Sequence, residues 1–233
     1  MQNSRVFKQL EKTKIQAQKN EMKLNYQKTK FIVFNPCRTK DFLPEFTIDG
    51  HDLEAVDEIR LLGIILRSDM RWTSNTENMI CKANKRLWIL RRLKNLGACH
   101  EDLVEVYTKQ IRCLLELAVP AWQGSITKAE KRDLERIQKC ATYIILGDQY
   151  ISYYNALQTL NLVSLEARRI KLTLKFALKS EKNVKFKFWF KLATKNVNTR
   201  SKKSKYCDVK ANYTRFARSP LSFITKILNL HHK

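Results

Sequence analysis

The chain has 233 residues, 44% of them hydrophobic, which is enough apolar material for one medium-sized core or two small ones. Its 45 lysines and arginines outnumber its 22 aspartates and glutamates, so the formal net charge is +23. This composition excludes a chain that is disordered throughout. The excess of positive charge indicates a polyanionic partner, with nucleic acid as the first candidate.

An anionic membrane is the second candidate, but the sequence argues against it. The longest apolar stretches, such as "CLLELAVPAW" from Cys113, are interrupted and fall far below the roughly 20 residues that span a bilayer. Charged residues from Lys8 to Lys14 break up the N-terminal segment, which lacks a signal-peptide pattern. We therefore expect a soluble, intracellular protein without a membrane partner; its composition does not distinguish nucleus from cytoplasm.

The residue types that carry catalysis or bind metals form no recognisable group. The six cysteines are scattered, with no Cys-x-x-Cys pair and no histidine at metal-ligand spacing. The nine aspartates include no adjacent pair, and the sequence has no glycine-rich phosphate loop. We expect no catalytic residue, metal site, disulfide framework or cofactor in this chain.

The N-terminal third reads as a short helix followed by strands. A run rich in Lys and Gln over residues 6–23 predicts a surface helix, and the apolar run in 29–35 predicts a strand. Asp49-Gly50 is a strong signal for a two-residue hairpin. Residues 58–66, "EIRLLGIIL", are apolar enough for a strand that is covered on most sides.

After Trp72 the pattern becomes helical. Ser74 and Glu77 form a capping box, and the helix that follows extends to Gly97. Its predicted apolar stripe consists of Ile80, Ala83, Leu87 and Leu90. Its other faces carry the basic residues Lys82, Lys85, Arg86, Arg91, Arg92 and Lys94.

Four more helices are predicted in the middle of the chain. The first extends from about residue 101 to Pro120, and the next begins at a capping box formed by Thr127 and Glu130. Ser152 and Ser164 are predicted to cap the last two. The buried positions are expected to be Leu103, Tyr107, Leu114 and Ala118 in the first helix and Leu134, Ile137, Ala141 and Ile145 in the second.

From Glu181 onward the chain is strongly basic, and aromatic residues alternate with lysines in "KFKFWFKLATK". Its periodicity is weak, so we expect it to be only partly ordered. The predicted fold is therefore α+β, mainly α. It comprises a small β region (1–70), a helical bundle (71–180) and a basic, aromatic-containing C-terminal segment (181–233).

An ordered series of segments carries a resemblance to a known family. The segments are "EMKLNYQKTKFIVF", "VDEIRLLGIIL" followed by "RW", "KANKRLWILRRLKNLGA", "VYTKQIRCLLELAVPAW", "LERIQKCATYIILG" and "ALQTLNLVSLEARRIKLTLKFALK". Together they resemble the C-terminal part of reverse transcriptases of non-LTR (LINE-like) retrotransposons, over nearly the whole chain. The resemblance implies a late palm strand, then the primer grip, then the thumb helices of an RNA-directed DNA polymerase.

The same resemblance predicts that this chain is inactive alone. Polymerases join nucleotides with two metal ions held by carboxylates. The Tyr-x-Asp-Asp hairpin of the family and its earlier metal-binding aspartate have no counterpart here. The resemblance therefore implies a truncated or decayed reading frame, with Mg²⁺ expected only for an intact family member. A palm and fingers part is a candidate partner, beside RNA and DNA in a template-primer duplex.

The candidate nucleic-acid-binding residues in the β region come from this resemblance. Lys28 and Lys30 lie in "KTK", which resembles the last palm motif, although they also fit surface lysines beside a strand. Leu61, Leu62 and Gly63 resemble the primer grip, where glycine permits close approach to a nucleic acid strand. The alternative for these three is a buried strand with a bulge at the glycine.

Two helices supply the remaining candidates, whose cations would contact phosphates without reading sequence. They are Arg86, Arg91, Arg92 and Lys94 on one helix and Arg168, Arg169, Lys171 and Lys175 on the other. Both sets also fit simple solvated faces. Trp88 and Trp122 are expected to fill the helical core. Phe186, Phe188, Trp189 and Phe190 fit packing and base stacking equally well.

Two further hypotheses stay open beside a reverse transcriptase fragment. One is a basic helical RNA-binding or ribonucleoprotein scaffold protein without polymerase ancestry. The other is an enzyme subunit whose active site is completed by another chain. A Tyr-x-Asp-Asp motif encoded shortly upstream would favour the fragment, and its absence would favour the scaffold.

Overall fold

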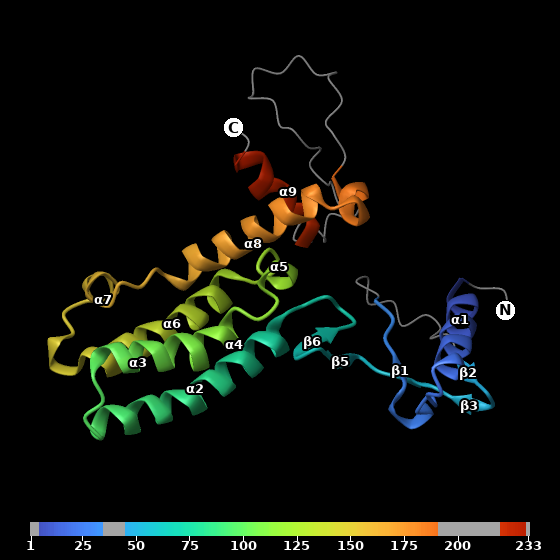
Figure 1. Cartoon of the computed structure of the whole chain (residues 1–233), viewed down its shortest axis with the longest axis horizontal. Helices are drawn as coiled ribbons and strands as arrows, with labels where there is room; N and C mark the ends of the chain where they lie inside the picture. Colours follow the sequence, from blue (N-terminus) through green and yellow to red (C-terminus); the bar gives the residue numbers. More distant parts are fainter. Residues whose placement is uncertain (1–4, 35–44, 191–219, 232–233) are drawn as a thin grey trace, which may run out of the picture. The chain divides into compact units, whose positions relative to one another are not determined.

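The computed structural model describes residues 5–34, 45–190 and 220–231 (Figure 1). Helices dominate these residues, and the described strands pair two by two. The expected α+β, mainly α fold is therefore confirmed. The chain forms two compact units, residues 1–59 with 67–70 and residues 60–66 with 71–233.

The first unit contains one helix and short strands. Its elements are α1 (Arg5–Lys19), the 3₁₀ turn η1 (Tyr26–Lys28), β1 (Lys30–Phe31), β2 (Thr47–Ile48), β3 (His51–Asp52) and β4 (Glu54–Ala55). The strand predicted over 29–35 is thus only two residues long among those described, and it pairs in parallel with β4. The predicted hairpin at Asp49-Gly50 is confirmed: β2 and β3 are antiparallel, and both turn residues have positive φ.

The Asp49 side chain connects the β2–β3 turn to the rest of this unit. Its carboxylate accepts hydrogen bonds from the Lys14 ammonium and, at 2.6 Å, from the Tyr26 hydroxyl. These two bonds, that from Lys14 first, hold the pKa of Asp49 below its usual value. The Tyr26 ring in turn stacks on His51, with ring centroids 4.8 Å apart. The turn is therefore held by an ion pair and a ring stack, which a small unit with few buried side chains needs.

Residues 58–66 form a hairpin, so the single covered strand predicted there is wrong. Its strands are β5 (Glu58–Leu61) and β6 (Ile64–Arg67). The turn between them consists of Leu62 and Gly63, with φ values of 47° and 91°. Two successive positive φ angles reverse the chain in a tight two-residue turn. As a result, the Leu62 side chain is 92% exposed at the tip.

The second unit contains the tip of that hairpin and the helices of the chain's remainder. The helical elements are α2 (Thr73–Asn95), α3 (His100–Val106), the π-helical η2 (Tyr107–Arg112), α4 (Cys113–Leu115), α5 (Val119–Trp122), α6 (Lys128–Leu146), η3 (Gly147–Gln149), α7 (Tyr153–Thr159), α8 (Leu165–Lys182), η4 (Val184–Trp189) and α9 (Pro220–His231).

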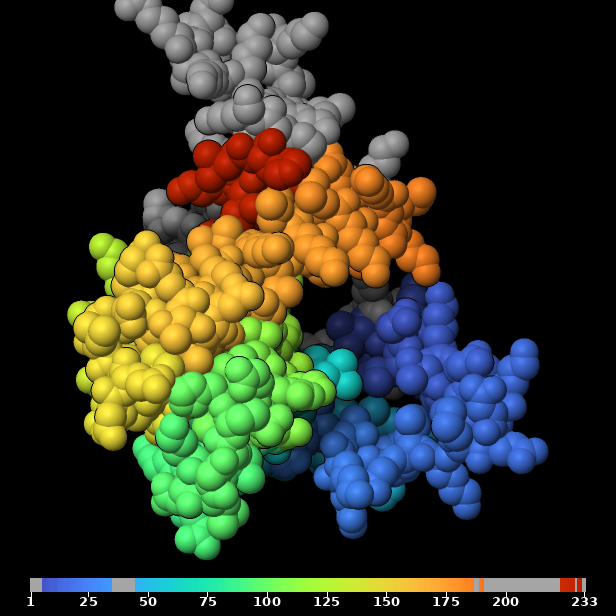
Figure 2. Space-filling model, turned by 60° about the vertical axis from the view of Figure 1, so that its left-hand side comes forward, coloured from blue at the N-terminus to red at the C-terminus, as the bar shows by residue number. Residues whose placement is uncertain are grey.

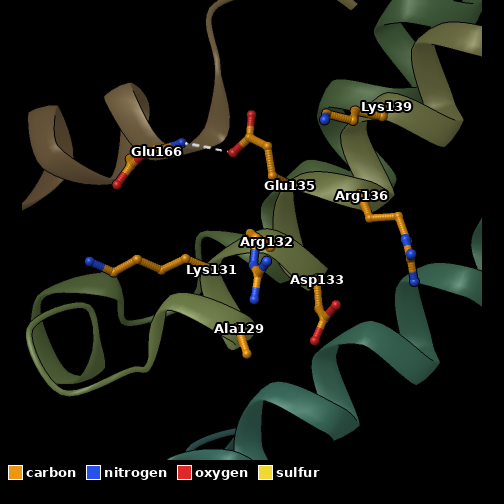
Figure 3. Close-up of a pocket in the computed structure, with 8 residues that line it drawn as sticks. All are labelled: Ala129, Lys131, Arg132, Asp133, Glu135, Arg136, Lys139 and Glu166. Carbon is orange, nitrogen blue, oxygen red and sulfur yellow. Dashed lines mark hydrogen bonds between the residues drawn. The ribbon is translucent and has the colours of Figure 1, made fainter.

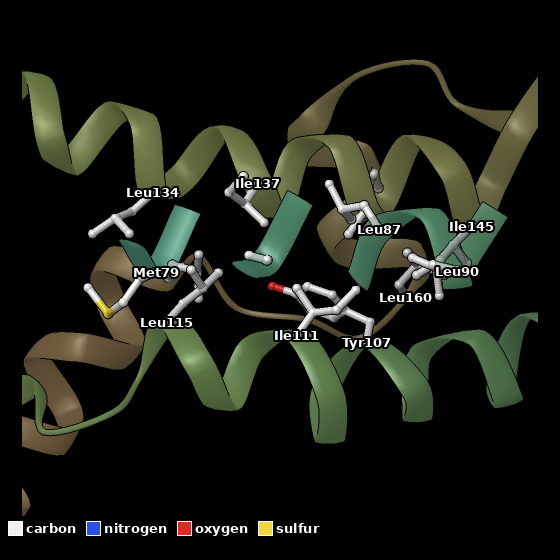
Figure 4. Packing of buried hydrophobic residues seen from close by; sticks show 14 of the residues in the cluster. Met79, Leu87, Leu90, Tyr107, Ile111, Leu115, Leu134, Ile137, Ile145 and Leu160 are labelled. Atoms are coloured by element: carbon white, nitrogen blue, oxygen red, sulfur yellow. The ribbon is translucent and has the colours of Figure 1, made fainter. Parts of the chain in front are cut away.

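The main core lies between α2, α6 and the continuous segment α3–η2–α4 (Figure 4). The stripe predicted for α6 is buried as expected. In α2, Ala83, Leu87 and Leu90 are buried with Met79, and Ile80 is half-buried. The spacing of these apolar positions matches a helix with one face on a core.

The helix after Gly97 differs from its prediction because it contains a π-helical segment. Its buried positions follow one another at a constant spacing of four: Leu103, Tyr107, Ile111 and Leu115. An α-helix of 3.6 residues per turn cannot keep this spacing on one side, whereas the wider turns of η2 can. The predicted core positions Leu114 and Ala118 are therefore wrong. The α-helix ends at Leu115, and Pro120 lies in the first turn of α5.

Three of the four predicted helix caps are confirmed. Thr127 and Glu130 form the capping box, and the Ser152 and Ser164 hydroxyls accept backbone N–H bonds in the first turns of α7 and α8. The box predicted at Ser74 is wrong. The helix α2 begins two residues earlier than this box predicts, with Trp72 at the N-cap position and no side-chain cap bond. Trp72 is buried in the main core, so packing fixes this end.

A smaller core joins α8, η4 and α9, which lie side by side in Figures 1 and 2. Its buried residues are Ala177, Phe190, Ile224 and Leu228. Trp189 packs against this cluster, and its ring lies 4.7 Å from that of Phe186. Of the two interpretations open for these aromatic residues, packing therefore describes Trp189 and Phe190. The side chain of Phe188 lies outside the described residues.

Candidate nucleic-acid interface

The basic residues of α2 occupy the side of the helix that faces away from the core. Met79, Ala83, Leu87 and Leu90 face α6 and η2. Helix periodicity places Lys85 and Arg92, seven residues apart, together on the opposite side. No Asp or Glu occurs between residues 78 and 100. After Glu77, near its start, the rest of this helix therefore presents positive charge without acidic side chains to neutralise it.

The candidate cations of α2 divide into two groups. Arg91 and Arg92 are exposed, as is Lys85, which the sequence placed on the same basic faces. By contrast, Arg86 donates to the carbonyl of Gln110, and Lys94 donates to the carbonyl of Ile145 at 2.8 Å. The second contact places a cation at the C-terminus of α6, where the helix dipole favours it. Arg86 and Lys94 thus fasten α2 to its neighbours, and the exposed cations are the ones available to a partner.

Trp88 lies on the outer side of α2 and is 61% exposed, so its predicted place in the core is wrong. It follows Leu87 directly, and one residue turns the helix by about 100°, which carries it off the buried stripe. The guanidinium carbon of Arg92 lies 5.7 Å from the centroid of its ring, within the range of a cation–π contact. Trp122 is buried as predicted, and its indole N–H donates to the carbonyl of Leu117 at 2.7 Å.

The two adjacent arginines of α8 both bond to other side chains of the protein. Arg168 forms a two-point ion pair with Glu116, whose second bond is 3.0 Å long, and this pairing raises the pKa of Arg168. Arg169 is fully buried, and its Nε donates to Gln123 at 2.9 Å. The two terminal nitrogens of Arg169 have no hydrogen-bond partner among the described residues, and burial lowers its pKa.

The prediction that Arg168 and Arg169 contact phosphates is therefore wrong for Arg169, which solvent does not reach, and unsupported for Arg168, which neutralises Glu116. Lys171 and Lys175 are exposed on the same helix. A phosphate-binding face of α8 would depend on these lysines, and α2 is the stronger candidate.

A buried polar network that the sequence did not reveal positions these helices. The Tyr107 hydroxyl donates to Gln138 at 2.6 Å, and the amide of Gln138 donates to the Tyr153 hydroxyl at 3.0 Å. Tyr153 donates in turn to Glu135. Because each buried group has a partner, the network fixes η2, α6 and α7 in one arrangement.

Glu135 also caps α8. Its carboxylate accepts the backbone N–H groups of Leu165 and Glu166 at 3.0 and 3.1 Å, in the first turn of that helix (Figure 3). A carboxylate there satisfies orphan donors and complements the helix dipole. This contact links positions 30 residues apart in sequence, so no local capping signal predicts it.

A groove of about 410 Å³ lies beside this contact (Figure 3). It is lined by Ala129, Lys131, Arg132, Asp133, Glu135, Arg136, Lys139 and Glu166. The lining mixes basic and acidic side chains, and the carboxylates would repel a phosphate backbone. The groove is therefore a poorer site for nucleic acid than the outer side of α2.

The residues that resemble a primer grip lie at the exposed tip of the β5–β6 hairpin. Leu61 and Leu62 are exposed, so the alternative of a buried strand with a bulge is wrong. Gly63 lies close to the turn between α4 and α5: a Cβ there would lie 3.2 Å from the side chain of Leu117. Glycine is suited to this position for two reasons: it adopts the positive φ of the turn without strain, and it has no Cβ to crowd Leu117.

The two candidate lysines of the first unit differ in their surroundings. Lys28 is exposed in η1, whereas the Lys30 ammonium pairs with Glu54 at 2.7 Å across the β1–β4 ladder. Lys30 therefore has a structural partner that competes with a phosphate. The interpretation as surface lysines beside a strand describes both positions.

Among the described residues, no group of three or more His, Cys, Asp or Glu side chains is placed to hold a metal ion. None of the described helices has the length and apolar character needed to cross a membrane. No family model matches the chain, and neither a curated protein nor a solved structure matches it. Any functional argument thus rests on the residues themselves.

Proposed function

We propose that this chain is the late-palm and thumb part of a reverse transcriptase of the non-LTR retrotransposon type, and that it binds template-primer nucleic acid through α2. The observation that carries the proposal is the outer side of this helix. Lys85, Arg91 and Arg92 are exposed there, within a stretch that has no acidic residue from 78 to 100. Such a surface is attractive to a phosphate backbone and needs no particular base sequence.

The order of elements supports the assignment to this family. A tight hairpin with the exposed tip Leu62-Gly63 directly precedes the helical bundle. In the family that the sequence resembles, the primer grip directly precedes the thumb. The first helix after this hairpin is also the one that has only basic charged residues from residue 78 to its end.

The described residues do not fit a two-metal polymerase site, which requires clustered carboxylates. Asp49 of the first unit is already bonded to Lys14 and Tyr26. The proposed role of this chain is therefore to hold nucleic acid, and we expect no nucleotide transfer by the chain alone.

The test is fluorescence anisotropy of the full chain with a labelled RNA–DNA template-primer at several salt concentrations. If the three exposed cations each neutralise one phosphate, the logarithm of affinity falls by at least about 2.7 per tenfold rise in salt. Absence of binding at about 50 mM salt, or binding that salt does not weaken, would refute the proposal.

A second measurement separates this proposal from a basic RNA-binding scaffold without polymerase ancestry. The reading frame upstream of the sequence is translated and searched for a Tyr-x-Asp-Asp motif. Its presence shortly upstream supports the polymerase assignment, whereas an unrelated upstream sequence favours the scaffold.

A further inference from the structure

The outer side of α2 carries large apolar side chains as well as positive charge. Trp88 and Ile89 are exposed there, and Leu96 is 80% exposed near the end of the same helix. A merely solvated helix face carries mainly polar residues. Exposed apolar groups that adjoin cations indicate a surface that contacts a partner.

The spacing of these residues suits one kind of partner. Lys85 lies three residues before Trp88 and Arg92 four residues after it, so each is about one turn away along the helix. The two cations are separated by about 10 Å along the axis, with the indole between them. The guanidinium of Arg92 lies near the ring, and the exposure of Trp88 leaves room for a second planar group.

We propose that Trp88 stacks on an unpaired base of a single-stranded nucleic acid segment, while Lys85 and Arg92 contact the phosphates beside that base. The inference rests on the proposed function, which supplies nucleic acid as the partner. It adds a base contact to phosphate contacts, and it assigns a single strand in place of a duplex. In a duplex the faces of the bases are covered by their neighbours, whereas an unpaired base offers its face to an aromatic side chain.

Positive charge argues for this occupant over a protein. The acidic residues nearest to Lys85, Trp88 and Arg92 in the sequence are Glu77 and Glu101, on either side of the segment that contains these three residues. A polyanion that also has exposed apolar ring faces matches both features of the surface. An apolar protein surface would match only the tryptophan and its aliphatic neighbours.

The experiment compares the affinity of the full chain for two probes of equal length and charge, an oligouridylate and an abasic sugar–phosphate oligomer. Stacking of one base on an aromatic side chain corresponds to a preference of about fivefold or more for the oligouridylate. We expect Trp88→Ala to abolish this preference while leaving the affinity for the abasic oligomer unchanged, and Trp88→Phe to keep most of it.

The matched control is Tyr154→Ala, which removes another exposed aromatic side chain, 73% exposed on α7, and should keep the wild-type preference. A preference that survives in Trp88→Ala overturns the inference and leaves this surface to a protein partner. An equal loss of affinity for both probes in that variant also overturns it, since stacking acts only on bases. If the wild-type chain binds the template-primer but neither single-stranded probe, the inference fails and the proposed function stands; if it binds the template-primer no better than these probes, the proposed function itself fails.

Discussion

Removal of the exposed cations of α2 should weaken nucleic-acid binding and its dependence on salt together. The variant is Lys85→Ala, Arg91→Ala, Arg92→Ala. All three side chains are exposed, and Arg92 alone has a described contact, with the Trp88 ring. We therefore expect the fold to persist, at a cost of about 0.5–1 kcal/mol for the lost cation–π contact.

The magnitude follows from counterion release. Each phosphate that a cation neutralises contributes about 0.9 to the slope of log affinity against log salt on a duplex. Three lost contacts should make the slope shallower by about 2.7, so that a tenfold rise in salt costs the wild-type chain about 500-fold more affinity than the variant. Anisotropy titrations at four or more salt concentrations measure both slopes.

The control variant loses the same number of positive charges from a different helix, α1. Lys8, Lys12 and Lys19 are exposed on α1, and their replacement by Ala removes three charges without touching α2. We expect the slope of this variant to stay near the wild-type value. An unchanged slope in the α2 variant, or equal flattening in both variants, would refute the assignment and show that only net charge matters.

Three other predictions concern the fold and the chemistry. Tyr107→Phe leaves a buried oxygen of Gln138 without its donor and should cost about 1–3 kcal/mol, seen as a melting point lower by several degrees, whereas Tyr154→Phe on the surface should melt as the wild type. The pKa of Asp49 is lowered in the fold mainly by Lys14, so its contribution to stability is present above the ordinary aspartate pKa and is lost as the pH falls through the lowered value. Hydrogen-exchange protection of α1 should fall in that acidic range, and Asp49→Asn should remove this pH dependence. The purified chain should not extend a primer on an RNA template with Mg²⁺. Template-dependent incorporation of nucleotides by the pure chain would contradict our inference that it lacks the carboxylates of a two-metal site.

Regular periodicity in α6 and three of the four local caps were predictable from the sequence. The buried stripe of α6 and the caps at Thr127, Ser152 and Ser164 depend on residues within one or two helical turns. The turn at Asp49-Gly50 was predictable for the same reason. The second two-residue turn was missed because Leu62 is an unusual residue at positive φ, and its apolar neighbours resemble a buried strand.

The candidate interface was only partly predictable, because sequence patterns do not show which cations are already bonded. Arg168 and Arg169 read alike, but adjacent helical positions point about 100° apart, so one reaches Glu116 and the other enters the core. Arg86 and Lys94 bond to distant carbonyls that only the packing of α2 brings near. The exposure of Trp88 could have been predicted, since it lies beside the apolar stripe and not on it.

The central claim, that α2 contacts nucleic acid, is tested most directly by lysine footprinting of the full chain with and without saturating template-primer. An amine-reactive reagent labels exposed lysines, and mass spectrometry measures the change at each. The account predicts that Lys85 becomes protected on binding while Lys8 and Lys12 of α1 react as before. Unchanged labelling of Lys85 in a fully bound chain would contradict it.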